Sequence, residues 1–218
     1  MKRFFLISIF ILPYMAAYAQ AKPKEFTHYI FPDFFKGVIL LKSGIKNEVK
    51  LNYNSLTEEM VFIDKAGLKQ AIPKEVIDNV DTVFVNGRKF CPVNHKLYEL
   101  LYHANSDLFA EHKCRLIAQG KPSGYGGTSQ TADVATFSSL RSSDKVYELN
   151  LPEDYDVKPY TYYWLKKDGQ LNRFTTMNQL MKLYESKKDI YKDYIKKHDV
   201  NFNNGGSIAL LVDYLETH

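Results

Sequence analysis

The sequence predicts an α+β protein that is mainly β: an antiparallel meander forming a curved or partly closed sheet, followed by a small C-terminal helical subdomain. From Lys36 to about Ile117, short apolar segments recur about ten residues apart, which is typical of antiparallel sheet. Asn86-Gly87 and Asp168-Gly169 each separate two such segments, and these pairs favour the positive φ of a two-residue hairpin turn. After Phe174 the hydrophobic period changes from two to 3.6, which indicates helices.

Length and composition exclude several classes of protein. The chain has 218 residues, of which 45% are hydrophobic and 14% aromatic, and it contains only two cysteines. Such a chain can bury a core, so it is not disordered, collagen-like or a scaffold held by disulfides. The length allows one domain and a smaller appendage.

The first nineteen residues have the pattern of a secretory signal peptide. Lys2 and Arg3 precede the apolar run Phe4–Leu12, and Ala17-Tyr18-Ala19 forms a small-x-small end, so cleavage is expected before Gln20. The alternative is an uncleaved anchor, but a membrane helix needs about 20 apolar residues, and this stretch reaches Ala19 at most, with Pro13 inside it. We therefore expect a periplasmic or secreted protein that does not span the membrane once the signal has been removed.

Removal of Lys2 and Arg3 leaves 27 basic residues against 25 acidic ones, so the mature chain has a net charge of +2. After Thr175 lysines and acidic residues are interleaved, which is typical of a solvated surface. Nucleic acid is therefore not expected as a partner.

The mature chain is divided into a β domain over residues 20–174 and a helical subdomain over residues 175–218. The predicted strands of the β domain are Gly37–Leu41, Glu48–Tyr53, Met60–Ile63, Leu68–Ile72, Thr82–Val85, Arg88–Val93, Leu97–Tyr102, Leu108–Ile117, Tyr160–Leu165 and Leu171–Phe174. Two segments between these strands are expected to be irregular: a glycine-rich and serine/threonine-rich loop over Gln119–Asp144, and the acidic piece Pro152–Pro159.

Three short amphipathic helices are expected at the C-terminus. Thr176 and Gln179 match a capping box that opens the first helix. The second helix begins at Ser186, and the third is indicated by apolar residues at helical spacing from Ile208 to Leu215. Helices this short are stable only when their apolar faces pack on each other or on the sheet.

The two cysteines are candidates for a disulfide, because an exported protein enters an oxidising compartment. In a simple meander the strand Leu97–Tyr102 separates Cys91 from Cys114 by about two strand spacings, roughly 9–10 Å. This exceeds the Cα separation of a disulfide. Two buried thiols are therefore slightly favoured, and the disulfide stays open because the strand order is not known.

Cys91 with His95 and His112 with Cys114 supply the ligand types of a zinc or copper site. Their spacing fixes no common geometry, so hydrogen-bonded residues are the preferred interpretation, and no metal or cofactor is expected. A cysteine–histidine nucleophile lacks a third residue to orient it.

Aromatic side chains supply the candidate ligand-binding residues, which are Tyr125, Tyr160, Tyr162 and Trp164. A second aromatic cluster consists of Phe31, Phe34 and Phe35. If exposed, such side chains stack on sugar rings or line a ligand groove. In a strand, alternate members of 160–164 face inward, so packing is the competing interpretation.

Three segments resemble an uncharacterised family of small exported proteins of Gram-negative bacteria. They are Val49–Phe62, the strand pair Val83–Phe90, and the C-terminal part Leu165–Tyr214 with its lysine-rich helix. The family has no established activity, so the resemblance implies an exported bacterial protein and identifies no catalytic residue.

The function expected from these observations is a non-enzymatic interaction or ligand-binding module of the cell envelope, with an envelope protein or a small ligand as partner. The alternative is a hydrolase or metal-dependent enzyme that uses His95, His103, His112 and the cysteines. An enzyme requires at least two of these side chains to converge in one pocket. A binding module instead requires an apolar concavity or an aromatic patch. A structural or assembly partner, the third possibility, would present an unpaired sheet edge.

Overall fold

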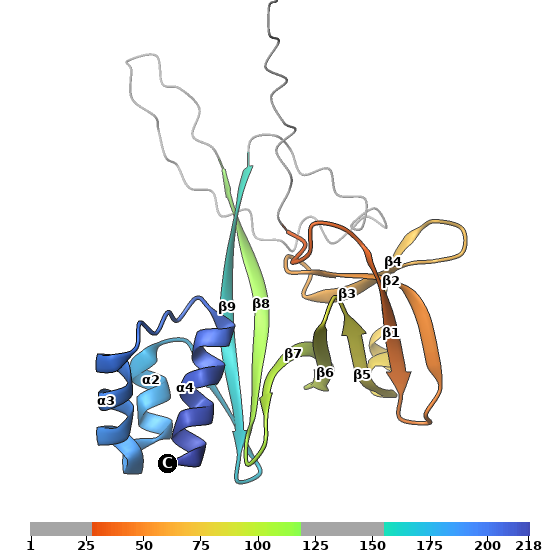
Figure 1. The fold of residues 1–218 in the computed structure, drawn as a ribbon. Helices are drawn as coiled ribbons and strands as arrows, with labels where there is room; N and C mark the ends of the chain where they lie inside the picture. The colour runs from red at the N-terminus through yellow and green to blue at the C-terminus, as the bar shows by residue number, and fades with distance from the viewer. Residues whose placement is uncertain (1–27, 119–154) are drawn as a thin grey trace, which may run out of the picture.

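The computed structural model describes residues 28–118 and 155–218. They form a ten-stranded antiparallel sheet that is not closed, followed by helices (Figure 1). The predicted fold class, α+β and mainly β, is therefore confirmed. The signal peptide expected over residues 1–19 and the loop expected over 119–144 lie outside the described residues.

The sheet consists of two meanders joined side by side. Its strands are β1 (Phe35–Leu41), β2 (Lys46–Asn54), β3 (Glu59–Ile63), β4 (Lys69–Ala71), β5 (Val80–Val85), β6 (Arg88–Val93), β7 (Lys96–His103), β8 (Asp107–Ala118), β9 (Tyr155–Lys167) and β10 (Gln170–Phe174). The order across the sheet is β10-β9-β8-β7-β6-β5-β1-β2-β3-β4. A simple meander would pair β5 with β4, whereas β5 pairs with β1 instead.

The change of direction after β4 has a local cause. Pro73 has no N–H to donate to a sheet, and it precedes the short helix α1 (Lys74–Ile77), which the sequence did not indicate. This helix carries the chain from β4 back to the far side of β1, where β5 begins.

Three two-residue hairpin turns have positive φ at both central residues. Asn86 and Gly87 have φ values of 48° and 74°, and Asp168 and Gly169 have values of 51° and 75°, as the sequence predicted. The turn between β6 and β7 uses the same geometry, since φ is 50° at Asn94 and 60° at His95. The sequence did not single out this third turn because His replaces the usual glycine.

Strand β9 is longer than expected. It pairs with β8 from Ala118↔Tyr155 to Asp107↔Lys166, so the prediction that Pro152–Pro159 is irregular is wrong for the described residues from 155 onward. Strand β10 pairs only with the later half of β9, from Tyr163 to Lys167. Pro159 therefore occupies a part of β9 with one described neighbour strand, and an edge position tolerates its missing N–H.

The C-terminal helices are α2 (Met177–Leu183), α3 (Lys188–Lys197) and α4 (Gly205–Thr217), with a 3₁₀ turn at Glu185–Lys187 between the first two. Thr176 caps α2, because its hydroxyl accepts a hydrogen bond from the Gln179 backbone N–H at 3.2 Å. The Gln179 side chain accepts from the backbone N–H of Thr175, one residue earlier than a capping box predicts.

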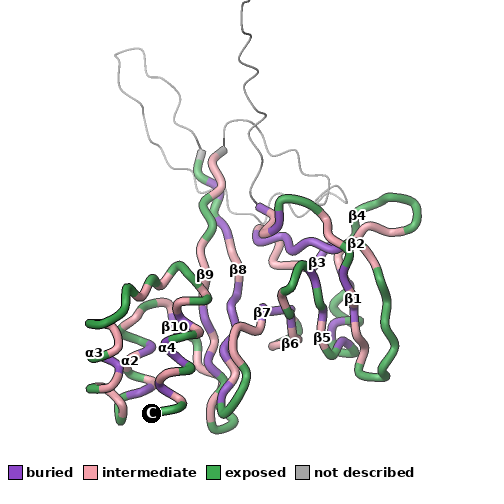
Figure 2. The backbone as a smooth tube through the Cα atoms, viewed as in Figure 1, coloured by how far each residue is buried: buried purple, intermediate pink, exposed green. Residues whose placement is uncertain are grey.

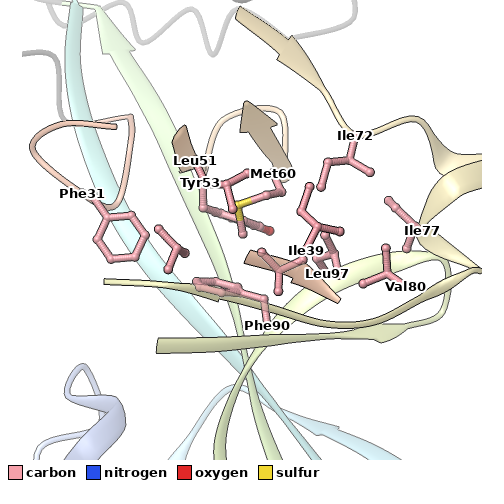
Figure 3. Packing of buried hydrophobic residues seen from close by; sticks show 12 residues of the cluster. Phe31, Ile39, Leu51, Tyr53, Met60, Ile72, Ile77, Val80, Phe90 and Leu97 are labelled. Atoms are coloured by element: carbon pink, nitrogen blue, oxygen red, sulfur yellow. The ribbon is translucent and has the colours of Figure 1, made fainter. Parts of the chain in front are cut away.

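The buried apolar side chains form two separate cores, and Figure 2 shows their buried backbone positions. The first core belongs to β1–β7, which we call the β lobe; Figure 3 shows Tyr53, Phe90 and Leu97 packed at its centre. The second core joins β8–β10 to α2–α4, which we call the helical lobe. Its strand residues, such as Tyr163 and Leu165, alternate with outward ones, so the helices cover one face of these strands.

The two lobes meet where β7 and β8 separate. These strands pair only from Glu99↔Ala110 to His103↔Asp107, and beyond Ala110 the turn between β2 and β3 lies beside β8. The backbone N–H of Cys114 donates to the carbonyl of Ser55 at 3.1 Å. Glu58, in the same turn, forms ion pairs with Lys96 of β7 and Lys113 of β8. The turn therefore fixes the β lobe against the long β8–β9 ribbon.

Candidate functional site

A pocket with a volume of about 900 Å³ lies at the junction of the lobes. We call it the interlobe pocket. Its walls come from residues 29–34 before β1, from β6–β9, and from residues 203–206 at the start of α4. Pockets of about 300–1,000 Å³ are typical of sites for small ligands.

The walls of the interlobe pocket bring together aromatic residues that are far apart in the sequence. Phe31 and Phe34, from one predicted cluster, and Tyr160, from the other, all line it. Cations lie against two of these rings: Lys69 Nζ is 5.5 Å from the centre of the Phe34 ring, and Arg88 Cζ is 5.3 Å from that of Phe31. The pocket therefore offers flat apolar surfaces next to positive charge.

A buried amide holds the aromatic wall in place. Asn52 of β2 donates from Nδ2 to the carbonyls of Phe31 at 3.0 Å and Asp33 at 2.9 Å, and its Oδ1 accepts from the Phe31 N–H. Its side chain is buried, so these bonds satisfy groups that water does not reach. The wall before β1 is thus pre-formed by the protein itself.

An ionic triad lines the interlobe pocket where β6, β7 and β8 adjoin. Arg88 donates to both carboxylate oxygens of Glu99 from Nε and Nη2, and His112 Nε2 lies 2.6 Å from Glu99 Oε2. Burial raises the pKa of Glu99, but the hydrogen bonds from His112 and Arg88 outweigh it and hold that pKa below its ordinary value. Glu99 is therefore ionised, so His112 donates to it, and the triad is already satisfied.

A second polar cluster lies beside the triad, around Lys113. Lys113 forms ion pairs with Glu58 and, at 3.2 Å, with Glu111. Glu111 also accepts a hydrogen bond from Trp164 Nε1 at 2.8 Å. The side chain of Glu111 is only 5% exposed, so its partners replace the water that it lost on folding. This cluster connects the turn between β2 and β3 to β9.

The predicted ligand-binding residues do not form one site. Tyr160, Tyr162 and Trp164 lie on the same face of β9, as alternation requires, while Tyr163 between them is fully buried. Of the three, only Tyr160 is among the residues that line the interlobe pocket. Tyr125 lies outside the described residues.

The histidines proposed for an enzyme lie in three different places. His95 Nδ1 is 2.7 Å from Asp78 Oδ1, and His103 Nδ1 is 2.5 Å from Asp107 Oδ1, both at exposed positions, whereas His112 belongs to the triad. Within residues 28–118 and 155–218, no three His, Cys, Asp or Glu side chains are grouped so that they could hold a metal ion.

Both cysteines are free thiols, on strands separated by β7. Burial raises the pKa of the Cys91 thiol and of the Cys114 thiol. A nucleophilic cysteine needs the opposite shift, because only the thiolate attacks. The geometry of the described residues thus offers no activated nucleophile at either position.

His28, at the start of the described chain, gives this protein a pH-dependent stability. Burial, with a smaller effect from Lys69, lowers its pKa from 6.5 to about 4. The unfolded chain therefore protonates His28 at a higher pH than the folded protein does. As a result, the free energy of unfolding is at its maximum above pH 6.5 and falls between pH 6.5 and pH 4. We expect a loss of about 1–2 kcal/mol over this range, after allowance for solvent screening.

The prediction is tested by urea unfolding at several pH values between 4.5 and 6.5, with His28→Gln as the comparison. The variant should lose the slope in this window because it has no group to protonate. An equal slope in both proteins would contradict the assignment. The carboxylates whose pKa is lowered, including Glu99, change the free energy of unfolding only below this pH range.

The sequence did not indicate Arg88 and Glu99 as site residues. Strand alternation offers one usable signal. Leu97, Glu99 and Leu101 are two residues apart, so their side chains are expected on the same face of the strand. A carboxylate on an inward, apolar face requires a partner. Nothing in the sequence identifies the partners, because Arg88 and His112 contact Glu99 from the two neighbouring strands, β6 and β8.

None of the described helices is both long and apolar enough to cross a membrane. Comparison with protein-family models, with curated proteins and with solved structures finds no match to this chain.

Proposed function

We propose that this protein is an exported, non-enzymatic binding module whose ligand occupies the interlobe pocket. Export is inferred from the charged, apolar and small-x-small pattern of residues 1–19. The observation that carries the binding role is the convergence of Phe31, Phe34 and Tyr160 with Lys69 and Arg88 around one pocket of ligand size.

The chemistry of the pocket favours binding over catalysis. The titratable triad is occupied by its own ion pairs, and Asn52 is fully engaged in holding the aromatic wall. What remains to contact a ligand is aromatic surface and the exposed Lys69 beside Phe34. We therefore infer a ligand with a flat or apolar part and an anionic group.

A thermal-shift screen with defined probes tests this proposal. The probes are amino acids, dipeptides, mono- and disaccharides, and dicarboxylates, each added to the purified mature protein. Ligands that bind only the native state raise the melting temperature. We expect at least one anionic probe to do so in the wild type, and expect the shift to be lost in Phe34→Ala and Lys69→Gln.

Phe84→Ala is the matched control, because Phe84 is another partly exposed phenylalanine that has a lysine over its ring, at 6.0 Å, but lies outside the pocket. It should keep the wild-type shift. If no probe stabilises the wild type, or if the pocket variants respond to every active probe as the wild type does, the proposal is wrong.

A further inference from the structure

We propose a second binding surface, for an acidic polysaccharide, on the face of β8–β10 opposite the helices. We call it the β9 stripe, and define it by Tyr160, Tyr162 and Trp164. These three side chains alternate with Tyr163 and Leu165, which are buried in the helical lobe, so the helices do not cover the stripe. All three are partly exposed.

Positive charges flank the stripe on both neighbouring strands. The register places Arg115 and Lys113 of β8 opposite Lys158 and Tyr160, and places Arg173 of β10 opposite Trp164. All of these residues therefore lie on the same face as the stripe. Arg115, Lys158 and Arg173 are exposed.

The arginines lie over the aromatic rings. Arg115 Cζ is 4.7 Å from the centre of the Tyr160 ring, and Arg173 Cζ is 5.0 Å from that of Tyr162 and 5.9 Å from that of Trp164. A guanidinium has five N–H donors, and this fork matches a carboxylate; some of the Arg115 donors already face the hydroxyls of Tyr160 and Tyr162. The rings thus orient the arginines before a ligand arrives.

The ion pairs described above are made by Arg88, Lys96 and Lys113, and not by the exposed cations of the stripe. Moreover, Arg115 lies directly opposite Lys158, and like charges at paired positions destabilise a sheet. An anion bound between them would relieve this repulsion.

The carboxylates on this face do not neutralise the end of the stripe where Arg115 and Lys158 lie. Glu111 is buried and engaged with Lys113 and Trp164, and Asp107 pairs with His103 at the opposite end of β8. Among the described residues, Asp156 of β9 also lies on this face, two residues from Lys158. Arg115, Lys158 and Arg173 still exceed it in charge, so the surface is complementary to an anion.

The spacing and chemistry favour an acidic polysaccharide over nucleic acid. Arg115 and Lys158 lie at paired positions beside Tyr160, and Arg173 lies opposite Trp164, so exposed positive groups follow the stripe from one end to the other. An extended chain of sugar carboxylates can meet such a row. Single-stranded nucleic acid requires open ring faces for base stacking, whereas guanidinium groups already lie over Tyr160 and Tyr162.

Calorimetric titration of the mature protein with an oligogalacturonate tests the proposal at two salt concentrations. A neutral glucan of equal length and an oligodeoxythymidylate serve as comparison probes. We expect the oligogalacturonate to bind more tightly than either, with an affinity that falls as salt rises. In the double variant Arg115→Gln/Arg173→Gln, we expect the affinity to fall about tenfold or more, because two charge-assisted contacts are lost.

Lys192→Gln/Lys196→Gln is the matched control, since it removes the same charge from exposed positions on α3. It should bind like the wild type, as should the pocket variant Phe34→Ala, which separates this surface from the interlobe pocket. The proposal is overturned if the wild type does not bind the oligogalacturonate, or if the neutral glucan or the oligodeoxythymidylate binds as tightly. An equal loss in the α3 control would overturn it too.

Discussion

Replacing Glu99 by glutamine is expected to lower the free energy of unfolding by about 3 kcal/mol, because it removes the buried charge to which the partly buried Arg88 and His112 are hydrogen-bonded. The side chain of Glu99 is 7% exposed, and those of Arg88 and His112 are 32% and 17% exposed. Glutamine keeps the shape but leaves the guanidinium without a counter-charge. The cost is below that of a fully buried pair, since water reaches part of Arg88.

Urea unfolding at neutral pH measures this loss, with Glu48→Gln as the control at an exposed position of β2. The control should stay within about 0.5 kcal/mol of the wild type. Because the pKa of Glu99 is lowered, its stabilisation is present above the unfolded value of 4.5 and disappears as pH falls through the folded value. The variant should therefore be less sensitive to acid than the wild type. A variant as stable as the wild type at pH 7 would show that the triad contributes nothing.

The second large effect is expected at Gly37, in the middle of β1. This strand lies between β2 and β5, and an added Cβ would lie 2.5 Å from the carbonyl oxygen of Phe84 and 2.7 Å from a methyl carbon of Leu51. The carbonyl belongs to the paired strand and cannot move away by a side-chain rotation. We expect Gly37→Ala to destabilise the protein by about 3 kcal/mol, at the upper end of overpacking costs.

Gly206→Ala provides the comparison, because its added Cβ would meet only the Asn204 side chain, at 3.3 Å, and alanine favours the helix. It should be neutral within about 1 kcal/mol. Both variants are compared with the wild type by thermal and urea unfolding. An equal effect at both positions would show that β1 can shift to make room.

Much of the fold is determined locally, which is why the sequence predicted it. Asn86-Gly87 and Asp168-Gly169 define their turns through backbone geometry alone. Thr176 caps α2 by accepting a hydrogen bond from the N–H of Gln179, only three residues further along the chain. Alternation along Tyr160–Leu165 likewise depends only on neighbours in the chain. The turn at Asn94-His95 was missed because histidine adopts positive φ less readily than glycine.

The candidate sites depend instead on contacts between distant parts of the chain. Glu99 contacts Arg88 and His112 only because β6, β7 and β8 are neighbours in the sheet. Phe31 and Tyr160 line the same pocket only because the tertiary structure brings their two segments together. The sequence identified the aromatic residues as candidates, but it could not assign them to one pocket or two surfaces. Sequence spacing carries no information about such distances.

The sequence by itself determined the fold class, two of the hairpin turns, the start of α2 and which side chains share a face, because these follow from backbone preferences and the periods of strands and helices. The tertiary structure alone decided that β1 pairs with β5, that β7 separates the two cysteines, and that the aromatic clusters meet at the junction of two cores. Those outcomes depend on which surfaces bury each other across the whole chain, and no local pattern records that choice.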